Sequence, residues 1–178
     1  MTFNLQLRQT SASDLDYVLT AETSSANSPY IMMWSRDQHH QAMDNANVAH
    51  LILESRAPAK CPTISQRVGY LIMVGLQDLD QSIQLRRIVV TDKGKGIGRW
   101  AIEQVKTLAF ETYQAHRLWL DVKPFNDRAR ALYKSAGFIE EGLLRDCHKT
   151  ESGYESLVIM SMLRPEFDAD MLLRSQKT

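Results

Sequence analysis

The chain has 178 residues, and 21 Lys and Arg residues balance 21 Asp and Glu residues, so its formal net charge is zero. A chain of this length can bury one full hydrophobic core and is short for two ordinary domains, so we expect a single domain over residues 1–178. A neutral chain creates no global field that would attract nucleic acid or an anionic membrane. Neither is an expected partner, and any anion site must be local.

Cysteine usage and hydropathy exclude further classes of protein. Cys61 and Cys147 lie 86 residues apart and outside any motif of zinc-binding spacing, so we expect reduced thiols and no bound metal. No run approaches the roughly 18 apolar residues that a membrane helix requires, and the first residues lack the pattern of a secretion signal. A cytoplasmic location is the corresponding expectation.

The first half of the chain predicts three strands and several short helices. Alternation of Phe3, Leu5 and Leu7 with polar residues indicates a half-buried strand, and Ser11 or Ser13 can cap the helix that follows. Residues 24–45 have weak periodicity and predict one or two short helices with loops, in the part expected to face the substrate. Residues 49–55 and 68–76 predict a long hairpin around a proline-containing stretch.

The second half predicts alternating strands and helices. A strand over residues 82–90 leads into a glycine-rich turn, and a helix from Ile97 ends near Tyr113. A strand over residues 116–122 precedes a helix that Asn126 caps and Gly137 closes. Residues 139–148 and 154–162 predict a last hairpin, and Pro165 begins a C-terminal helix or tail. This order predicts a mixed α/β domain around one sheet.

The glycine-rich turn is the most informative motif. Gly94, Gly96 and Gly98 can adopt positive φ and carry no Cβ, so the backbone N–H groups can converge on an anion at the positive end of the following helix. Lys93 and Lys95 add positive charge to the same turn. The pattern therefore predicts a phosphate-binding turn.

Three other interpretations compete for this turn. A Walker P-loop requires G-x-x-x-x-G-K-[ST], but Arg99 and Trp100 follow Gly98, so no hydroxyl is placed to hold magnesium. A Rossmann fingerprint requires G-x-G-x-x-G, whereas these glycines follow G-x-G-x-G, although Asp121 stands where that fold carries an acid. A turn that uses glycine for its shape alone is the third.

A second motif, DVKPFNDRARALYKSAGF at residues 121–138, decides between them. The two motifs together resemble the GCN5-related N-acetyltransferase (GNAT) superfamily over roughly residues 68–163. Residues 93–98 are similar to its R/Q-x-x-G-x-G/A loop, which holds the pyrophosphate of coenzyme A, with Lys93 in place of Arg or Gln. Residues 126–138 are similar to its N-x-x-A-x-x-L-Y-x-x-x-G-F element. Residues 141–146 and 153–162 look most like the branch with ribosomal-protein alanine and spermidine acetyltransferases.

The resemblance implies a fold, a co-substrate and an activity. The implied fold is a single GNAT-like domain with a central, mostly antiparallel sheet of about seven strands, splayed at the cofactor site and flanked by helices. The implied activity is transfer of acetyl from acetyl-CoA to a primary amine of a small molecule or a protein N-terminus, by direct attack in a ternary complex; a homodimer is compatible with it. The implied cofactor-binding residues are Ile88, Val89, Val90, Lys93, Gly94, Lys95, Gly96, Ile97, Gly98, Asn126 and Tyr133.

The resemblance also implies catalytic roles. Tyr133 matches the family's general acid toward the leaving thiolate, although its place on an apolar helix stripe also fits a core tyrosine. Asn126 fits both a helix cap and a ligand of the coenzyme. Gln84 stands where related sequences often carry a glutamate base, and it cannot accept a proton. The base is then a carboxylate elsewhere (Glu54, Asp121 or Glu155), an ordered water chain, or absent.

The sequence is also compatible with two other functions. A non-catalytic acyl-CoA-binding or sensing module would keep the turn without needing a base, and a Rossmann oxidoreductase is the more distant alternative.

Several residues outside the motifs carry weaker expectations. His39 and His40 fit surface histidines, and Arg87, like Arg86, fits an exposed residue, a structural ion pair or a holder of a carboxylate substrate. An apolar set in the substrate-facing part fits an acceptor wall or core packing equally well. Its members are Tyr30, Met32, Met33 and Trp34.

Overall fold

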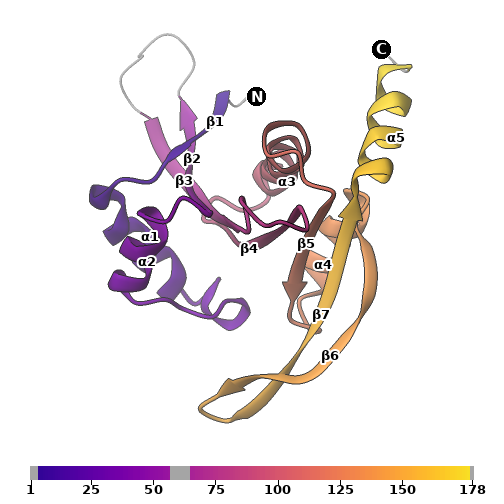
Figure 1. Cartoon of the computed structure of the whole chain (residues 1–178). Coiled ribbons are helices and arrows are strands. Elements are labelled where there is room, and N and C mark those ends of the chain that lie inside the picture. Colours follow the sequence, from indigo (N-terminus) through magenta and orange to yellow (C-terminus); the bar gives the residue numbers. More distant parts are fainter. Residues whose placement is uncertain (1–3, 57–64, 177–178) are drawn as a thin grey trace. The chain divides into compact units, whose positions relative to one another are not determined.

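The computed structural model describes residues 4–56 and 65–176, and its seven strands form one mixed sheet in the order β1-β2-β3-β4-β5-β7-β6 (Figure 1). The strands are β1 (Asn4–Gln9), β2 (Val48–Arg56), β3 (Ser65–Val74), β4 (Ser82–Val90), β5 (Arg117–Val122), β6 (Ile139–Thr150) and β7 (Gly153–Leu163). The α-helices are α1 (Leu15–Thr23), α2 (Arg36–Met43), α3 (Ile97–Thr107), α4 (Asp127–Ser135) and α5 (Arg164–Ser175). These elements confirm the predicted order. Phe3, Cys61 and the proline-containing stretch at 57–64 lie outside the described residues.

The chain forms two compact units. The first contains residues 1–74 and 86–101, and the second contains residues 75–85 and 102–178. Both β4 and α3 therefore contribute residues to each unit. The expectation of a single domain stays a prediction.

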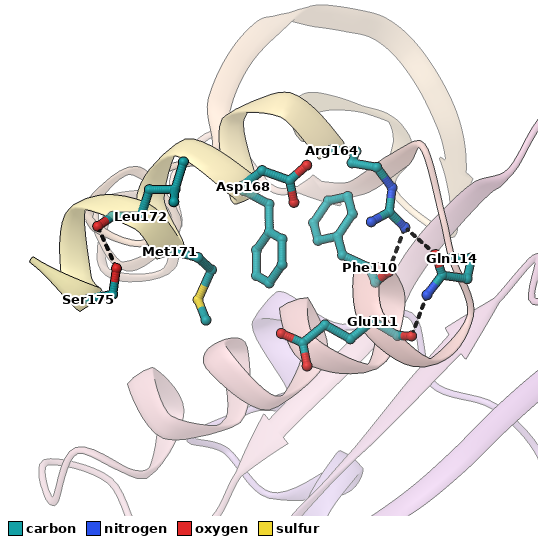
Figure 2. A pocket seen from close by; sticks show the side chains of 9 residues that line it. Phe110, Glu111, Gln114, Arg164, Asp168, Met171, Leu172 and Ser175 are labelled. Atoms are coloured by element: carbon teal, nitrogen blue, oxygen red, sulfur yellow. Dashed lines mark hydrogen bonds between the residues drawn. The ribbon is translucent and has the colours of Figure 1, made fainter.

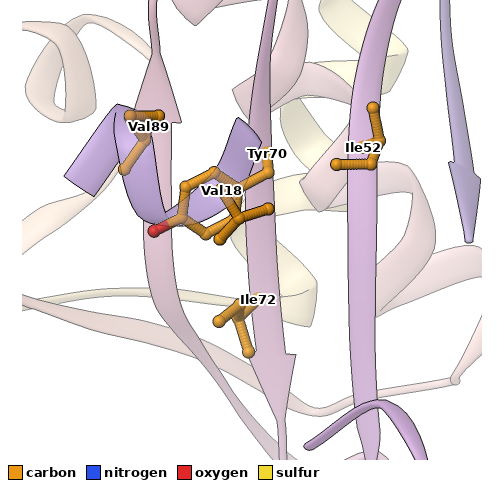
Figure 3. Close-up of a cluster of buried hydrophobic side chains, with 6 residues drawn as sticks. Val18, Ile52, Tyr70, Ile72 and Val89 are labelled. Atoms are coloured by element: carbon orange, nitrogen blue, oxygen red, sulfur yellow. The ribbon is translucent and has the colours of Figure 1, made fainter. Parts of the chain in front are cut away.

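The core of the first unit lies between α1 and its strands (Figure 3). β1 and β3 both pair with β2 in antiparallel fashion. Val18 of α1 packs with Ile52 on β2, Tyr70 and Ile72 on β3, and Val89 on β4. This cluster fixes the strand that leads into the glycine-rich turn.

The close approach of β3 and β4 depends on Gly69. A Cβ at this position would lie 2.3 Å from the carbonyl oxygen of Val89, which is backbone and cannot turn aside. At the end of β4, the Thr91 amide donates to Val68 O at 2.9 Å. The strand that leads into the turn is therefore held against β3 by main-chain contacts.

Polar residues are buried beside this core. Glu22 and His39 are 1% and 0% exposed, and His50 is 2% exposed. The expectation of a surface position is therefore wrong for His39, because α2 turns this side chain inward, where its ring lies edge-on to those of His50 and Tyr70.

His50 has a strongly shifted pKa. Burial, then the charges of His39 and Arg87, lower its pKa from 6.5 to about 4, while Glu22 and Asp14 oppose the shift. The unfolded chain therefore takes up a proton on this ring at a higher pH than the folded chain does.

We expect acidification from about pH 7 to about pH 4.5 to cost the folded chain about 2 kcal/mol through His50. The stability is complete above the unfolded pKa and is lost as the pH falls toward the folded pKa of about 4. Urea unfolding at the two pH values measures the loss, and His50→Gln should remove most of it. An equal loss in the variant would show that other groups cause it.

The second unit is built around the β6–β7 hairpin. β7 pairs in antiparallel fashion with both β5 and β6, and β4 pairs in parallel with β5 from Ser82 to Gln84. Two register shifts interrupt the β6–β7 ladder. Figure 1 shows β6 and β7 as a long twisted hairpin from which α5 continues.

Helices α3, α4 and α5 are joined by a buried lysine. Lys106, 1% exposed, donates to Ala136 O at the end of α4 at 3.1 Å and to Asp170 of α5 at 3.0 Å. Beyond α3, residues Leu108–Thr112 form a π-helical turn, in which the Tyr113 amide donates to Leu108 O. The sequence predicted the end of this helix near Tyr113 but not the change of pitch.

An open groove lies between this π-helical turn and α5 (Figure 2). Phe110 and Phe167 stack at its base, with ring centroids 4.8 Å apart. Arg164 donates to Phe110 O and Ala115 O, which fixes the start of α5. Exposed Met171 and Leu172 complete its apolar lining.

Three further observations apply to the described residues. None of their helices is long and apolar enough to cross a membrane. Within the same residues, no group of three His, Cys, Asp or Glu side chains is arranged to hold a metal ion. Cys147 is a free, exposed thiol.

Candidate functional site

The glycine-rich turn adopts the backbone that the sequence predicts for an anion cradle. Gly94 has φ 84° and Gly96 has φ 78°, in the left-handed region that favours glycine. A Cβ at either position would have no protein atom within 4 Å, so the turn is open on the side where side chains would stand. The space and the conformation together fit a turn that a phosphate group approaches closely.

The start of α3 supplies further donors. The Trp100 amide donates to Gly96 O at 3.0 Å, which makes Gly96 the residue that opens the helix. Helix geometry leaves the first-turn amides, from Ile97 onward, without acceptors inside the helix, and the helix dipole makes this end positive. Ile97 is itself 1% exposed, so its buried side chain anchors the end of the turn.

The two lysines of the turn already have protein partners. Lys93 donates from Nζ to Ala26 O at 2.6 Å, and Lys95 pairs with Asp92 at 2.8 Å. Both lysines are exposed. Their charge is present at the turn, as the sequence predicts, but each has a local contact that a bound anion would share or replace.

Residues 88–90 of β4 offer main-chain groups. Val89 is buried in the core of the first unit, and Ile88 and Val90 are half-buried. A contact between these residues and an extended ligand would therefore use N–H and C=O groups, as the resemblance implies.

Helix α4, in the second unit, carries the second motif. The side chain of Asn126 accepts from the Ala129 amide at 3.2 Å, so the predicted N-cap is confirmed. Tyr133 is 7% exposed, and its ring lies 6.0 Å from that of Phe138. Within the part of the chain that the structure describes, the Tyr133 hydroxyl has no hydrogen-bond partner.

Burial raises the pKa of Tyr133 well above its ordinary value, and the charge of Asp121 raises it further. The phenol therefore keeps its proton across the physiological pH range. A protonated hydroxyl can donate a hydrogen bond to developing negative charge on a nearby atom. A protonated phenol in this position can therefore serve as a donor.

Gln84 of β4 contacts a carboxylate on the neighbouring strand. It is 8% exposed, and its Nε2 donates to Asp121 Oδ1 on β5 at 2.6 Å. A carboxylate of the neighbouring strand therefore lies at hydrogen-bond distance from the glutamine at position 84.

The other two carboxylates named as candidate bases are in ion pairs. Glu54 accepts from Arg8 at 2.7 Å and from Gln6 at 2.8 Å, and Glu155 pairs with Lys123 at 2.9 Å. Burial raises the pKa of Glu54, but these hydrogen bonds outweigh burial, and the net pKa lies below its usual value. A carboxylate held in this way is a weak proton acceptor.

Sequence reasoning missed a buried ion pair in the first unit. Glu22 of α1 accepts from Arg87 of β4 and from Tyr70, and burial of both partners isolates the pair from solvent. A signal was present, because Glu22 follows Leu15 and Val18 at helical spacing on the buried face of α1. Of the alternatives for Arg87, the structural ion pair is the one observed.

Comparison with known proteins finds a partial family match. The model of the Acetyltransferase (GNAT) family matches residues 63–138, which include the turn and all of α4. This stretch of the chain is similar to the GNAT family. The seven-stranded mixed sheet is the GNAT fold, as the resemblance predicted.

Two curated proteins are similar to part of the chain. The putative ribosomal N-acetyltransferase YdaF of Bacillus subtilis is 30% identical over 102 residues, which are 55% of this chain and 56% of that protein. The [ribosomal protein bS18]-alanine N-acetyltransferase of Salmonella typhimurium is 37% identical over 68 residues, 38% of this chain and 45% of that protein. The chain thus aligns with about half the length of these relatives.

A solved structure matches the fold of nearly the whole chain. The crystal structure of spermidine N-acetyltransferase from Vibrio cholerae in complex with CoA and spermine has a TM-score of 0.77 and 20% identity. The match covers 92% of this chain and 97% of that one. The resemblance to the ribosomal-protein and spermidine acetyltransferase branch is confirmed.

Proposed function

We propose that this chain is an acetyl-CoA-dependent N-acetyltransferase that acts on a primary amine of a small molecule or a protein N-terminus. The observation that carries the proposal is the open turn at Gly94 and Gly96, with positive φ at both residues and a helix beginning directly after it. The match of residues 63–138 to the GNAT family model, together with the CoA complex of the similar Vibrio cholerae structure, supports a coenzyme A ligand for such a turn.

Donor binding is assigned to the turn and to β4. The amides of residues 94–98 would hold the pyrophosphate, with Lys93 and Lys95 adding charge. Main-chain groups of residues 88–90 would bind the pantetheine arm, and Asn126 would contact its amides while it caps α4. Acetyl-CoA supplies the acetyl group as a thioester, and the amine attacks it directly in a ternary complex.

Proton transfer is assigned to two residues of the second unit. Tyr133 would donate its hydroxyl proton, or a hydrogen bond, to the sulfur as the thiolate leaves. Asp121 would accept the proton of the amine, directly or through water. It is favoured because it lies at hydrogen-bond distance from Gln84 and because its charge already acts on Tyr133.

The proposal predicts thiol release when the chain is mixed with acetyl-CoA and a suitable amine. A panel of spermidine, amino acids, aminoglycosides and peptides with a free N-terminal alanine covers the proposed acceptors, including those named for the relatives. Acetylated product detected by mass spectrometry separates transfer from thioester hydrolysis. Tight acetyl-CoA binding without acetylation of any member of the panel would count heavily against the proposal.

A non-catalytic acyl-CoA-binding module is the second candidate. Gln84 supports it, because an amide at this position cannot take a proton. The adjacent Asp121 supports the enzyme instead, as does the hydroxyl of buried Tyr133, which has no hydrogen-bond partner among the described residues.

A further inference from the structure

Residues 31–35 connect η2 (Ser28–Tyr30) to α2 without helix or strand, and their main chain is held by two buried charged side chains. Arg87 donates from Nη2 to Met32 O, and Glu22 accepts from the Trp34 amide at 3.0 Å. The Arg87 guanidinium also lies over the Trp34 ring, 4.7 Å from its centroid. One ion pair therefore fixes this segment at two backbone points.

The ion pair is unusual because it is almost fully buried. Glu22 is 1% exposed and Arg87 is 5% exposed. Removing both charges from water is expensive, and apolar residues of similar size often replace such pairs with no loss of stability. The pair is therefore better explained by the geometry that it imposes than by the stability that it adds.

Two hydrogen-bonded histidines lie beside Glu22. Thr10 Oγ1 lies 2.8 Å from His50 Nδ1, and His50 Nε2 lies 2.9 Å from His39 Nδ1. His39 Nε2 is 3.3 Å from Glu22 Oε1. The His39 ring therefore contacts Glu22 in addition to the ion pair with Arg87.

The held segment exposes an apolar side chain. Met33 is 58% exposed, and Tyr30, directly before the segment, is 43% exposed. Ala26, four residues before Tyr30, accepts a hydrogen bond from Lys93 of the glycine-rich turn. The stretch that leads into the held segment therefore contacts the proposed pyrophosphate loop.

We propose that Glu22 and Arg87 are positioning residues that hold residues 31–35 as a wall of the acceptor pocket and so determine which amine is accepted. The inference rests on the proposed function. Met33 and Tyr30 would contact the acceptor through apolar surface, and the ion pair would set where those side chains stand.

The test is Arg87→Lys, with Arg86→Lys as the matched control on the same strand. Lysine keeps the cation beside Glu22 but lacks the planar fork that reaches Glu22 and Met32 O together. With spermidine and an N-terminal alanine peptide as probes, we expect the acceptor KM to rise about tenfold while the KM for acetyl-CoA stays within about twofold. The ratio of kcat/KM between the probes should also change. Arg86→Lys should leave all of these values unaltered.

A purely structural pair would give a different pattern. Arg87→Lys would then lower the urea midpoint while the folded protein keeps both KM values and the probe ratio, which would overturn the proposal. If Arg87→Lys fails to fold, Glu22→Gln replaces it, because the amide oxygen can still accept from Trp34 and Tyr70.

If the unaltered chain acetylates neither probe, that result counts against the proposed function and not against the positioning role. Amide hydrogen exchange then tests whether the ion pair holds residues 31–35. Faster exchange across residues 31–35 in Arg87→Lys than in Arg86→Lys supports the clamp, and equal exchange overturns it.

Discussion

Replacement of Gly96 by valine is expected to weaken coenzyme A binding by about a hundredfold, because one or two charge-assisted hydrogen bonds to the pyrophosphate would be lost. Gly96 has φ 78°, a conformation that a β-branched residue avoids. The added side chain would also stand in the open space of the turn. Isothermal titration with coenzyme A measures the change directly.

Gly153→Val is the matched control for this variant. Gly153 also has a positive φ, 134°, and a Cβ there meets no protein atom within 4 Å, but it begins β7, directly after the turn from β6. The control should cost stability of the order of 1–2 kcal/mol, as Gly96→Val should, while leaving coenzyme A affinity unchanged. Equal affinity of both variants would contradict the role assigned to residues 93–98.

Tyr133→Phe is expected to lower kcat by about 10²-fold to 10³-fold, because the group that donates to the leaving thiolate is removed. The ring that packs near Phe138 is retained, and the hydroxyl has no partner among the described residues, so the fold should survive. The dissociation constant of coenzyme A should stay within about twofold. Steady-state rates and titration on the same preparation give both values.

Tyr154→Phe, which removes a hydroxyl from a 65% exposed tyrosine, should leave kcat unaltered. A Tyr133→Phe variant with full activity would remove the proposed acid from the mechanism. A chain that binds acetyl-CoA tightly but turns over no amine, with or without Tyr133, would instead support the non-catalytic module.

Much of the fold was predictable because its local signals agree. β4 spans Ser82–Val90, the residues predicted from the β-branched run, and Asn126 caps α4 as its type and position indicate. The π-helical turn after α3 was not predicted, because i+4 and i+5 pitch give nearly the same apolar spacing over a single turn.

The site was predictable where it depends on the backbone. Positive φ at Gly94 and Gly96 follows from residue type, whereas the contact of Gln84 with Asp121 joins residues 37 apart in sequence through a strand pairing. The burial of His39 was missed for the same reason. Its partners Glu22 and His50 lie on other elements, so nothing in the local sequence of α2 marks this histidine as buried.

If residues 94–98 bind the pyrophosphate of acetyl-CoA, the amide chemical shifts of these residues should report the contact. Titration of the ¹⁵N-labelled chain with acetyl-CoA should shift the amide resonances of Gly94, Gly96 and Gly98, as their hydrogen bonds to phosphate oxygens form. The Gly153 resonance should stay in place, and NAD should cause no such shifts. Saturation with acetyl-CoA that leaves the three glycine resonances unmoved would contradict the claim.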